Sequence, residues 1–169
     1  MSDLTMSEEF SPAGTLAAPV DLHGRDLVFT RVYPAPLERV WAAWTRPEHF
    51  TRWFGPHGTT IPFCVMDVRP GGEFRFQHRH ADGGEVWAEG MYREVAAPGR
   101  LVIDVGFGDP EGQRRREGFS PSMRITVTLR EHPRGTELTV RHAGVGMDRG
   151  ESRGWNEGLD RLASLLASY

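Results

Sequence analysis

The residues best suited to chemistry are two histidines in the segment "GEFRFQHRH". His78 and His80 stand two residues apart in an alternating stretch, so their side chains point to the same face of a strand. Two imidazoles on one face can bind zinc if a third ligand reaches them, and His142 and Glu89 are the candidates. The pattern favours the alternative, in which the pair forms the polar rim of an open cavity. We therefore predict no metal and no cofactor.

Acid–base catalysis is a second possibility, because an apolar cavity shifts the pKa of a side chain placed in it. Glu89, His78 and Asp104 are the candidates. Nucleophilic catalysis has less support. Ser120 lacks the strand-to-helix turn that activates a serine, and Cys64 stands in mid-strand among apolar residues, as an inert buried thiol does. Nothing in the sequence demands a reaction, so no catalytic residue is assigned.

Several other chemistries are excluded or disfavoured. All 20 basic residues are arginine, and without lysine neither Schiff-base chemistry nor a P-loop can operate. The segment "GVGMDRG" stands between a strand and a helix like a dinucleotide loop, but its glycine spacing differs and no parallel strand follows. The charged run "QRRREG" is typical of a solvated loop, with a lid over the cavity as the alternative.

The amino-acid composition is typical of an ordinary globular protein. It has 169 residues, a formal net charge of −3 and a pI near 6.2, so no strongly basic surface for nucleic acid is expected. A single cysteine excludes an internal disulfide and is typical of a reducing compartment. No apolar run approaches the roughly 18 residues of a membrane span, and no signal peptide precedes the first strand. We therefore expect a cytoplasmic location.

The periodicity of apolar residues predicts the elements that position these side chains. Residues 1–24 show none and are expected to form a flexible tail before a single domain, 25–169. A strand is predicted over 25–33, followed by two short helices over 34–45 and 46–54. Six further strands are predicted over 59–68, 72–80, 85–95, 100–107, 122–131 and 136–143. An amphipathic helix over 153–168 closes the chain.

Short turns between the strands favour sequential antiparallel pairing, and only the last helix is long enough to cover the sheet. The predicted fold is therefore α+β, a helix-grip. A curved seven-stranded antiparallel sheet wraps around a long C-terminal helix, with two short helices after the first strand. The C-terminal helix is expected to bury Trp155, Leu159, Leu162 and Leu166 against the sheet.

Strand alternation then predicts which side chains face that helix. Phe76 and His78 share a face, as do Met123 and Ile125. The strand over 85–95 is ambiguous, because either its odd-numbered residues, such as Trp87 and Met91, or its even-numbered ones point inward. Aromatic, methionine and histidine side chains converging on a concave face are typical of a ligand pocket, and equally of a filled core.

The sequence also resembles a known family. The segments "ERVWAAWTRPEHFTRWFGP", "DVRPGGEF", "GMYREVAAPGRLV", "GTELTVRHAG" and "GWNEGLDRLASLL" are similar, in order, to the START-like (SRPBCC) superfamily. Within it they resemble the branch of homologues of the activator of the ninety-kilodalton heat-shock-protein ATPase. The resemblance implies a helix-grip fold with a second short helix at the mouth of a cavity, but no shared catalytic motif.

Three functions follow as hypotheses. The first is binding of a small hydrophobic or aromatic molecule, such as a lipid or polyketide-like compound, between the sheet and the last helix. The second is an enzyme such as a cyclase, dehydratase or hydrolase that uses the same cavity. The third, implied by the family name alone, is a chaperone-partner module. The predicted lining residues are Trp53, Phe54, Phe76, His78, Trp87, Met91, Phe107, Met123, His142, Trp155 and Leu159.

The aromatic segment "PEHFTRWFGP" carries two interpretations of its own. By the resemblance, Trp53 and Phe54 are wall or gate residues of the cavity. The alternative is that Trp53 fastens the short helices to the core.

Overall fold

The computed structural model describes residues 26–111, 122–145 and 150–169. The predicted tail over 1–24, the charged run "QRRREG", Ser120 and most of "GVGMDRG" lie outside these residues. Among the residues described, no helix has the length and apolarity that a membrane crossing requires.

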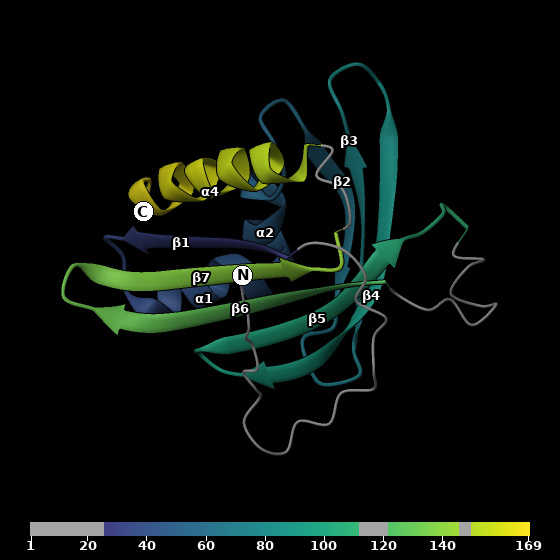
Figure 1. Ribbon diagram of the computed structural model, residues 1–169. Helices are drawn as coiled ribbons and strands as arrows, with labels where there is room; N and C mark the ends of the chain where they lie inside the picture. The colour runs from purple at the N-terminus through teal and green to yellow at the C-terminus, as the bar shows by residue number, and fades with distance from the viewer. Residues whose placement is uncertain (1–25, 112–121, 146–149) are drawn as a thin grey trace, which may run out of the picture.

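Seven strands form one antiparallel sheet in the order β1-β7-β6-β5-β4-β3-β2 (Figure 1). From β2 to β7, each strand therefore pairs with the strand that follows it in the chain. The first strand, β1, lies at the edge of the sheet and pairs with the last strand, β7. The strands are β1 (Leu27–Tyr33), β2 (Thr60–Met66), β3 (Glu73–Arg79), β4 (Glu85–Ala96), β5 (Arg100–Phe107), β6 (Met123–His132) and β7 (Gly135–Ala143).

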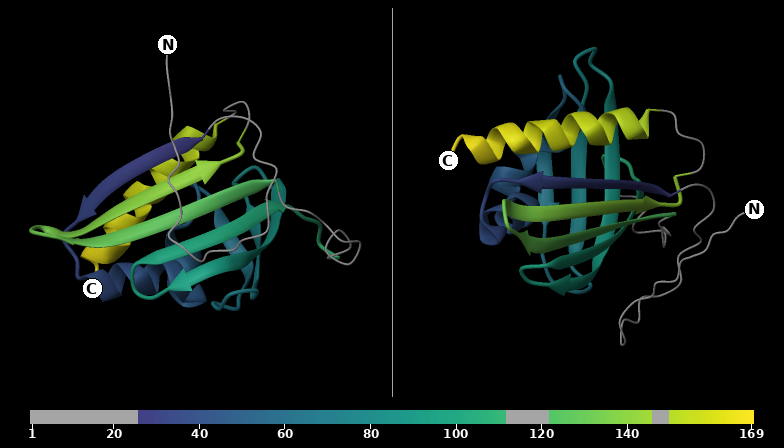
Figure 2. Two further views of the ribbon diagram at one scale, coloured as in Figure 1. Left: turned by 60° about the horizontal axis from the view of Figure 1, so that its bottom comes forward. Right: turned by 60° about the vertical axis from the view of Figure 1, so that its left-hand side comes forward.

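The described helices are α1 (Leu37–Thr45), α2 (Pro47–Trp53) and α4 (Glu151–Ala167). Helix α4 lies across one side of the sheet, while β2, β3 and β4 run in a different direction from β1, β6 and β7 (Figures 1 and 2). The sheet is therefore curved around the helix, as the helix-grip prediction requires. The helix begins two residues earlier than predicted, at Glu151 instead of Arg153.

The inner face of α4 forms part of the core. Leu159 and Leu162 have no exposed surface, and Trp155 and Leu166 are also buried, so the predicted apolar face of this helix is confirmed. Burial of each leucine contributes about 1.5–3 kcal/mol to folding. The same core includes Tyr33 of β1 and large apolar side chains from both short helices.

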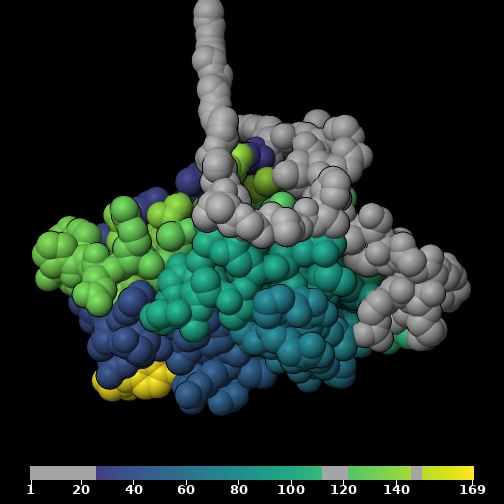
Figure 3. Space-filling model, turned by 90° about the horizontal axis from the view of Figure 1, so that it is seen from below, coloured from purple at the N-terminus to yellow at the C-terminus, as the bar shows by residue number. Residues whose placement is uncertain are grey.

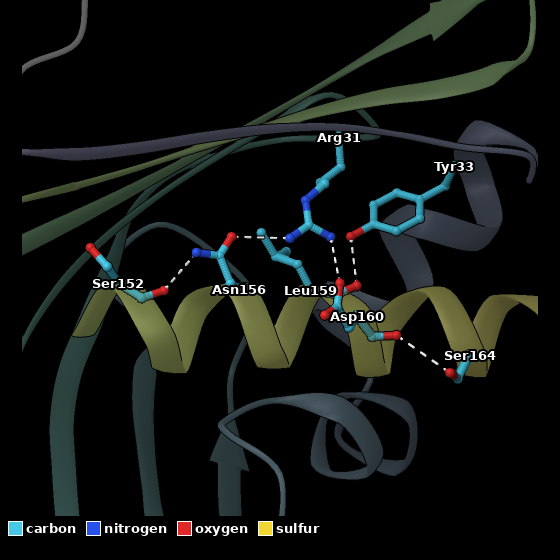
Figure 4. Close-up of polar contacts among 7 residues, drawn as sticks. All are labelled: Arg31, Tyr33, Ser152, Asn156, Leu159, Asp160 and Ser164. Atoms are coloured by element: carbon cyan, nitrogen blue, oxygen red, sulfur yellow. Dashed lines mark hydrogen bonds and ion pairs between the residues drawn. The ribbon is translucent and has the colours of Figure 1, made fainter. Parts of the chain in front are cut away.

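Polar contacts fix the position of α4 along β1 (Figure 4). The Tyr33 hydroxyl donates to the backbone carbonyl of Leu159 at 3.0 Å, and burial raises the pKa of that hydroxyl well above its usual range. Arg31 forms an ion pair with Asp160 at 2.9 Å and donates to Asn156 at 3.1 Å. Because hydrogen bonds are directional, these contacts join defined positions of α4 and β1.

The side away from α4 is shown in Figure 3, where the surfaces of β4 and β5 (teal) lie beside the short helices (blue). This outer face of the sheet carries ion pairs in place of an apolar core. Asp104 has no exposed surface and is bound by Arg93 at 2.6 Å and Arg124 at 2.7 Å. Arg75 binds Glu89 at 3.1 Å. The two faces of the sheet therefore differ sharply in chemistry.

Candidate functional site

A cavity of about 280 Å³ lies between the inner face of the sheet, the end of α2 and the N-terminal half of α4. Phe107 and Val86, exposed at 56% and 37%, stand on its lining and mark where it meets solvent. The lining residues are Trp53, Phe54, Gly55, Pro56, Phe74, Phe76, His78, His80, Val86, Ala88, Val105, Gly106, Phe107, Met123, Ile125, His142, Glu151, Gly154, Trp155 and Gly158.

Phe54 is the central aromatic side chain of the cavity wall. It ends α2 and is only partly buried. Its ring stacks on Phe50 at 4.5 Å between centroids and meets Trp155 edge-on at 5.5 Å. It also stacks on His78 at 5.9 Å. Such offset and edge-to-face contacts hold aromatic rings in defined orientations, so this wall is shaped before any ligand arrives.

Trp53, the neighbour of Phe54, holds α1 and α2 together. Its side chain has no exposed surface, and its indole N–H donates to the backbone carbonyl of Ala43 in α1 at 2.9 Å. Its ring also meets Trp44 edge-on at 4.8 Å. Trp53 also borders the cavity, but its main contacts are with α1. The aromatic segment therefore combines a structural tryptophan with a phenylalanine of the cavity wall.

The turn between α2 and β2 is bound to α4. The Arg161 guanidinium donates to the backbone carbonyls of Gly55 and Pro56, both at 3.0 Å. The carboxylate of Glu157 accepts from the backbone N–H of His57 at 3.0 Å. Gly55 has φ +103°, and a Cβ there would lie 2.1 Å from Nε2 of His78, so only glycine fits. These contacts fix the turn in place as one wall of the cavity.

His78 lies under this turn. Its Nε2 is 3.2 Å from the backbone carbonyl of Phe54, and because a carbonyl only accepts, the proton of the neutral ring is on Nε2. Burial is the main reason that the pKa of His78 is lowered. The hydrogen bond to the Phe54 carbonyl opposes that shift, and electrostatic interactions with His80 and Arg161 add to it. The side chain therefore presents a neutral imidazole to the cavity at pH 7.

His142 on β7 is oriented by α4. The indole N–H of Trp155 donates to Nδ1 of His142 at 2.9 Å. Because Nδ1 accepts, the proton of the neutral ring is on Nε2, which lies 3.3 Å from the sulfur of Met123. Burial lowers the pKa of His142 to about 4, against the opposing effect of the Glu151 and Asp26 carboxylates. This imidazole is neutral at pH 7 as well.

The depressed pKa predicts how stability depends on pH. The unfolded chain binds a proton on His142 near its ordinary pKa of 6.5, whereas the folded chain resists until about pH 4. The stabilising contribution is therefore complete above pH 6.5 and is lost as pH falls toward 4, by about 2 kcal/mol at pH 5. Urea unfolding of wild type and His142→Phe at pH 7 and pH 5 measures this term. Equal pH dependence in the two proteins would contradict it.

Eight of the predicted lining residues surround the cavity: Trp53, Phe54, Phe76, His78, Phe107, Met123, His142 and Trp155. The predicted set did not contain the other lining residues: Gly55, Pro56, Phe74, His80, Val86, Ala88, Val105, Gly106, Ile125, Glu151, Gly154 and Gly158. An inward direction for Val86 and Ala88 was the second of the two alternatives left open for their strand. The anchoring contacts of Arg161 and Glu157 also had no sequence signal, because each joins segments far apart in the chain.

Trp87 and Met91 do not line the cavity, and this corrects the prediction. Ala88 on β4 pairs with Phe76 on β3, so the even-numbered residues of this part of β4 face inward. The ring of Trp87 therefore lies on the outer face, with the Arg75 guanidinium 4.6 Å from its centroid. Met91 pairs with Glu73 on that same face.

Leu159 is not a lining residue either. It is fully buried in the core, beyond the part of α4 that borders the cavity, which ends at Gly158. The helix therefore contributes Trp155 to the cavity and its following leucines to the core.

The structure also separates the predicted acid–base and metal-binding candidates between the two faces of the sheet. Glu89 and Asp104 are bound to arginines on the outer face, so neither reaches His78 across the sheet. His78 and His80 lie 6.0 Å apart between ring centroids, both on the lining. Over the ranges that the structure describes, no group of three His, Cys, Asp or Glu side chains is placed to hold a metal.

A curved antiparallel sheet, a C-terminal helix across it and an apolar cavity between them define the START-like (SRPBCC) class. The family model described as "Activator of Hsp90 ATPase homolog 1-like protein" matches residues 34–167. The chain belongs to this family. Comparison with curated proteins gave no match.

Solved structures agree with this assignment. A protein from Chromobacterium violaceum is 26% identical over 83% of this chain and 96% of its own, with a TM-score of 0.73. A protein from Nitrosomonas europaea is 25% identical over 89% of this chain and 97% of its own, with a TM-score of 0.72. A third, from Mycobacterium smegmatis, is 23% identical over 90% and 98%, with a TM-score of 0.73, and supports the fold alone.

Proposed function

We propose that the chain binds a small, largely apolar, aromatic molecule in the cavity between the sheet and α4. The observation that carries this proposal is the cavity itself, about 280 Å³ in volume and lined mainly by aromatic and aliphatic side chains. Ligand sites in proteins are apolar clefts of about 300–1,000 Å³ with few polar groups, and this cavity is close to the lower end of that range.

Two further features favour a binding site over a packing defect. The wall is held open by hydrogen bonds from Arg161 and by the ring contacts of Phe54, neither of which depends on a ligand. The rim side chains Val86 and Phe107 are exposed apolar residues next to the cavity, where an entering apolar molecule would first make contact.

The family description also suggests stimulation of a heat-shock ATPase. That function rests on the name given to relatives, whereas the cavity is a feature of this chain. An enzymatic role would have to use His78, His80, His142 or Glu151, the titratable side chains that line the cavity. Binding requires none of them to react, so it is the function that the geometry supports best.

Filling the cavity tests the proposal. Ala88 is a small lining residue on β4, and Ala88→Phe would occupy the space that a ligand needs. We expect this variant to bind N-phenyl-1-naphthylamine, an uncharged aromatic fluorophore, at least about tenfold more weakly than wild type, since it removes most of the apolar contact area. Fluorescence titration measures the affinity.

Val28→Phe is the matched control, because Val28 on the edge strand β1 is 59% exposed and does not line the cavity. It adds the same side chain without touching the site, so its affinity should equal that of wild type. An Ala88→Phe protein that melts normally and binds the fluorophore as wild type does would place binding elsewhere.

A further inference from the structure

One hydrogen-bond donor in the cavity has only a weak acceptor. Trp155 fixes the tautomer of His142 by donating to Nδ1 at 2.9 Å, which leaves the proton on Nε2. That N–H is directed at the sulfur of Met123, 3.3 Å away. Both side chains belong to the lining, so this donor is presented at the cavity wall.

A thioether is a poor hydrogen-bond acceptor, and a donor left without a good acceptor in apolar surroundings costs free energy. Met123 is partly buried, unbranched and rotatable, so it can move aside for a better partner. An oxygen atom placed near Nε2 would form the stronger hydrogen bond. The cavity wall thus offers a hydrogen-bond donor at Nε2 of His142.

The charges around the cavity restrict what can supply that oxygen. No arginine is among the lining residues, and burial lowers the pKa of both His78 and His142. The electrostatic effects of His80 and Arg161 act on His78, whereas those on His142 come from carboxylates. The carboxylate of Glu151 borders the cavity, and those of Glu151 and Asp26 both act on His142. An anionic group placed at Nε2 of His142 would therefore lose its hydration beside two carboxylates, with no counter-charge among the groups that act on His142.

We infer that the preferred ligand is an uncharged aromatic molecule carrying a carbonyl or ether oxygen, which accepts the Nε2–H of His142 in place of the Met123 sulfur. This inference rests on the proposed binding function and specifies its ligand class. His142 is then the residue that recognises the oxygen, and Trp155 acts through it by fixing its tautomer. The remaining lining supplies shape and apolar contact.

Three naphthalenes test the inference by equilibrium dialysis against the full chain at pH 7.5. 1-Acetylnaphthalene carries the carbonyl, 1-ethylnaphthalene has the same carbon skeleton without the oxygen, and 1-naphthoate carries a charge. The readout is the ratio of the ketone affinity to the ethyl affinity in each protein. Differences in hydrophobicity between the two molecules cancel when this ratio is compared between variants.

We expect His142→Phe to lower the ratio by about five- to tenfold, the value of one hydrogen bond. Met123→Leu removes the competing sulfur and leaves His142 and Trp155 in place, so it should raise the ratio by about two- to fivefold. 1-Naphthoate should bind at least about tenfold more weakly than the ketone. If His142→Phe fails to fold, Met123→Leu decides alone.

An unchanged ratio in Met123→Leu and in folded His142→Phe overturns the inference, as does tight binding of 1-naphthoate. In either case the proposed function stands, provided that the uncharged molecules bind wild type. If neither 1-acetylnaphthalene nor 1-ethylnaphthalene binds at all, the proposed function itself fails. The two failures are therefore distinct.

Discussion

The variant Leu162→Asp is expected to lose cooperative folding at 25 °C. Leu162 has no exposed surface and stands at the centre of the apolar face of α4. Removing a buried leucine side chain costs about 2–5 kcal/mol, and burying an unpaired carboxylate costs several more. Together these costs are comparable with the total stability of most domains, which is roughly 5–15 kcal/mol. Far-UV circular dichroism during urea unfolding measures the loss.

Ala163→Asp provides the matched control, because Ala163 is the next residue of the same helix and is exposed. It introduces the same charge into α4 without burying it, so its unfolding free energy should change by less than about 1 kcal/mol. A Leu162→Asp protein as stable as this control would mean that α4 does not pack on the sheet through this face.

The variant Trp53→Ala is expected to lower the free energy of unfolding by about 3–5 kcal/mol, the usual cost of truncating a fully buried aromatic side chain. The loss has two sources. The cavity left behind removes the edge contact with Trp44, and the carbonyl of Ala43 loses the indole N–H that binds it. Chemical denaturation at constant pH gives the difference directly.

Phe54→Ala separates the structural role from the wall role. Phe54 is partly exposed, so its truncation should cost less than about half as much as that of Trp53. The same change removes the ring between His78 and Trp155 and should weaken binding of N-phenyl-1-naphthylamine. If Trp53→Ala left stability unchanged and abolished binding, Trp53 would instead be a gate residue.

Much of this architecture could be predicted because local patterns determine it. The alternation around Phe76 and His78 gave the correct inner face of β3, and the spacing of Trp155, Leu159 and Leu162 gave the buried face of α4. In each case one face of the element is apolar and the other is polar or charged, so only one face can be buried against the core.

Strand β4 shows where this reasoning fails. Trp87 and Met91 are the larger apolar residues, yet Val86 and Ala88 line the cavity. The outer face accepts Trp87 because the Arg75 guanidinium lies over its ring, a contact between different strands. The alternation of β4 therefore left both faces open, and pairing with β3 resolves which one lines the cavity.

The finer features of the site depend on contacts between distant segments. The tautomer of His142 is set by a tryptophan on another element, and the α2–β2 turn is held by Arg161 from the last helix. Spacing marks Trp155 as a buried residue of α4, but it does not indicate that the indole N–H meets His142. Arg161 carries no such mark and stands among the ordinary polar residues of the helix. The lining residues could thus be predicted in part, but which of their nitrogen atoms donates a hydrogen bond could not.

During synthesis, β1 emerges first, but its partner in the described sheet, β7, emerges only after every other strand. Trp155 follows later still and completes both the cavity wall and the orientation of His142. Pairing between segments so distant in sequence slows folding, and the inner face meanwhile remains open to aggregation. The cavity is therefore a late product of folding, because its wall is complete only after the last helix has been made.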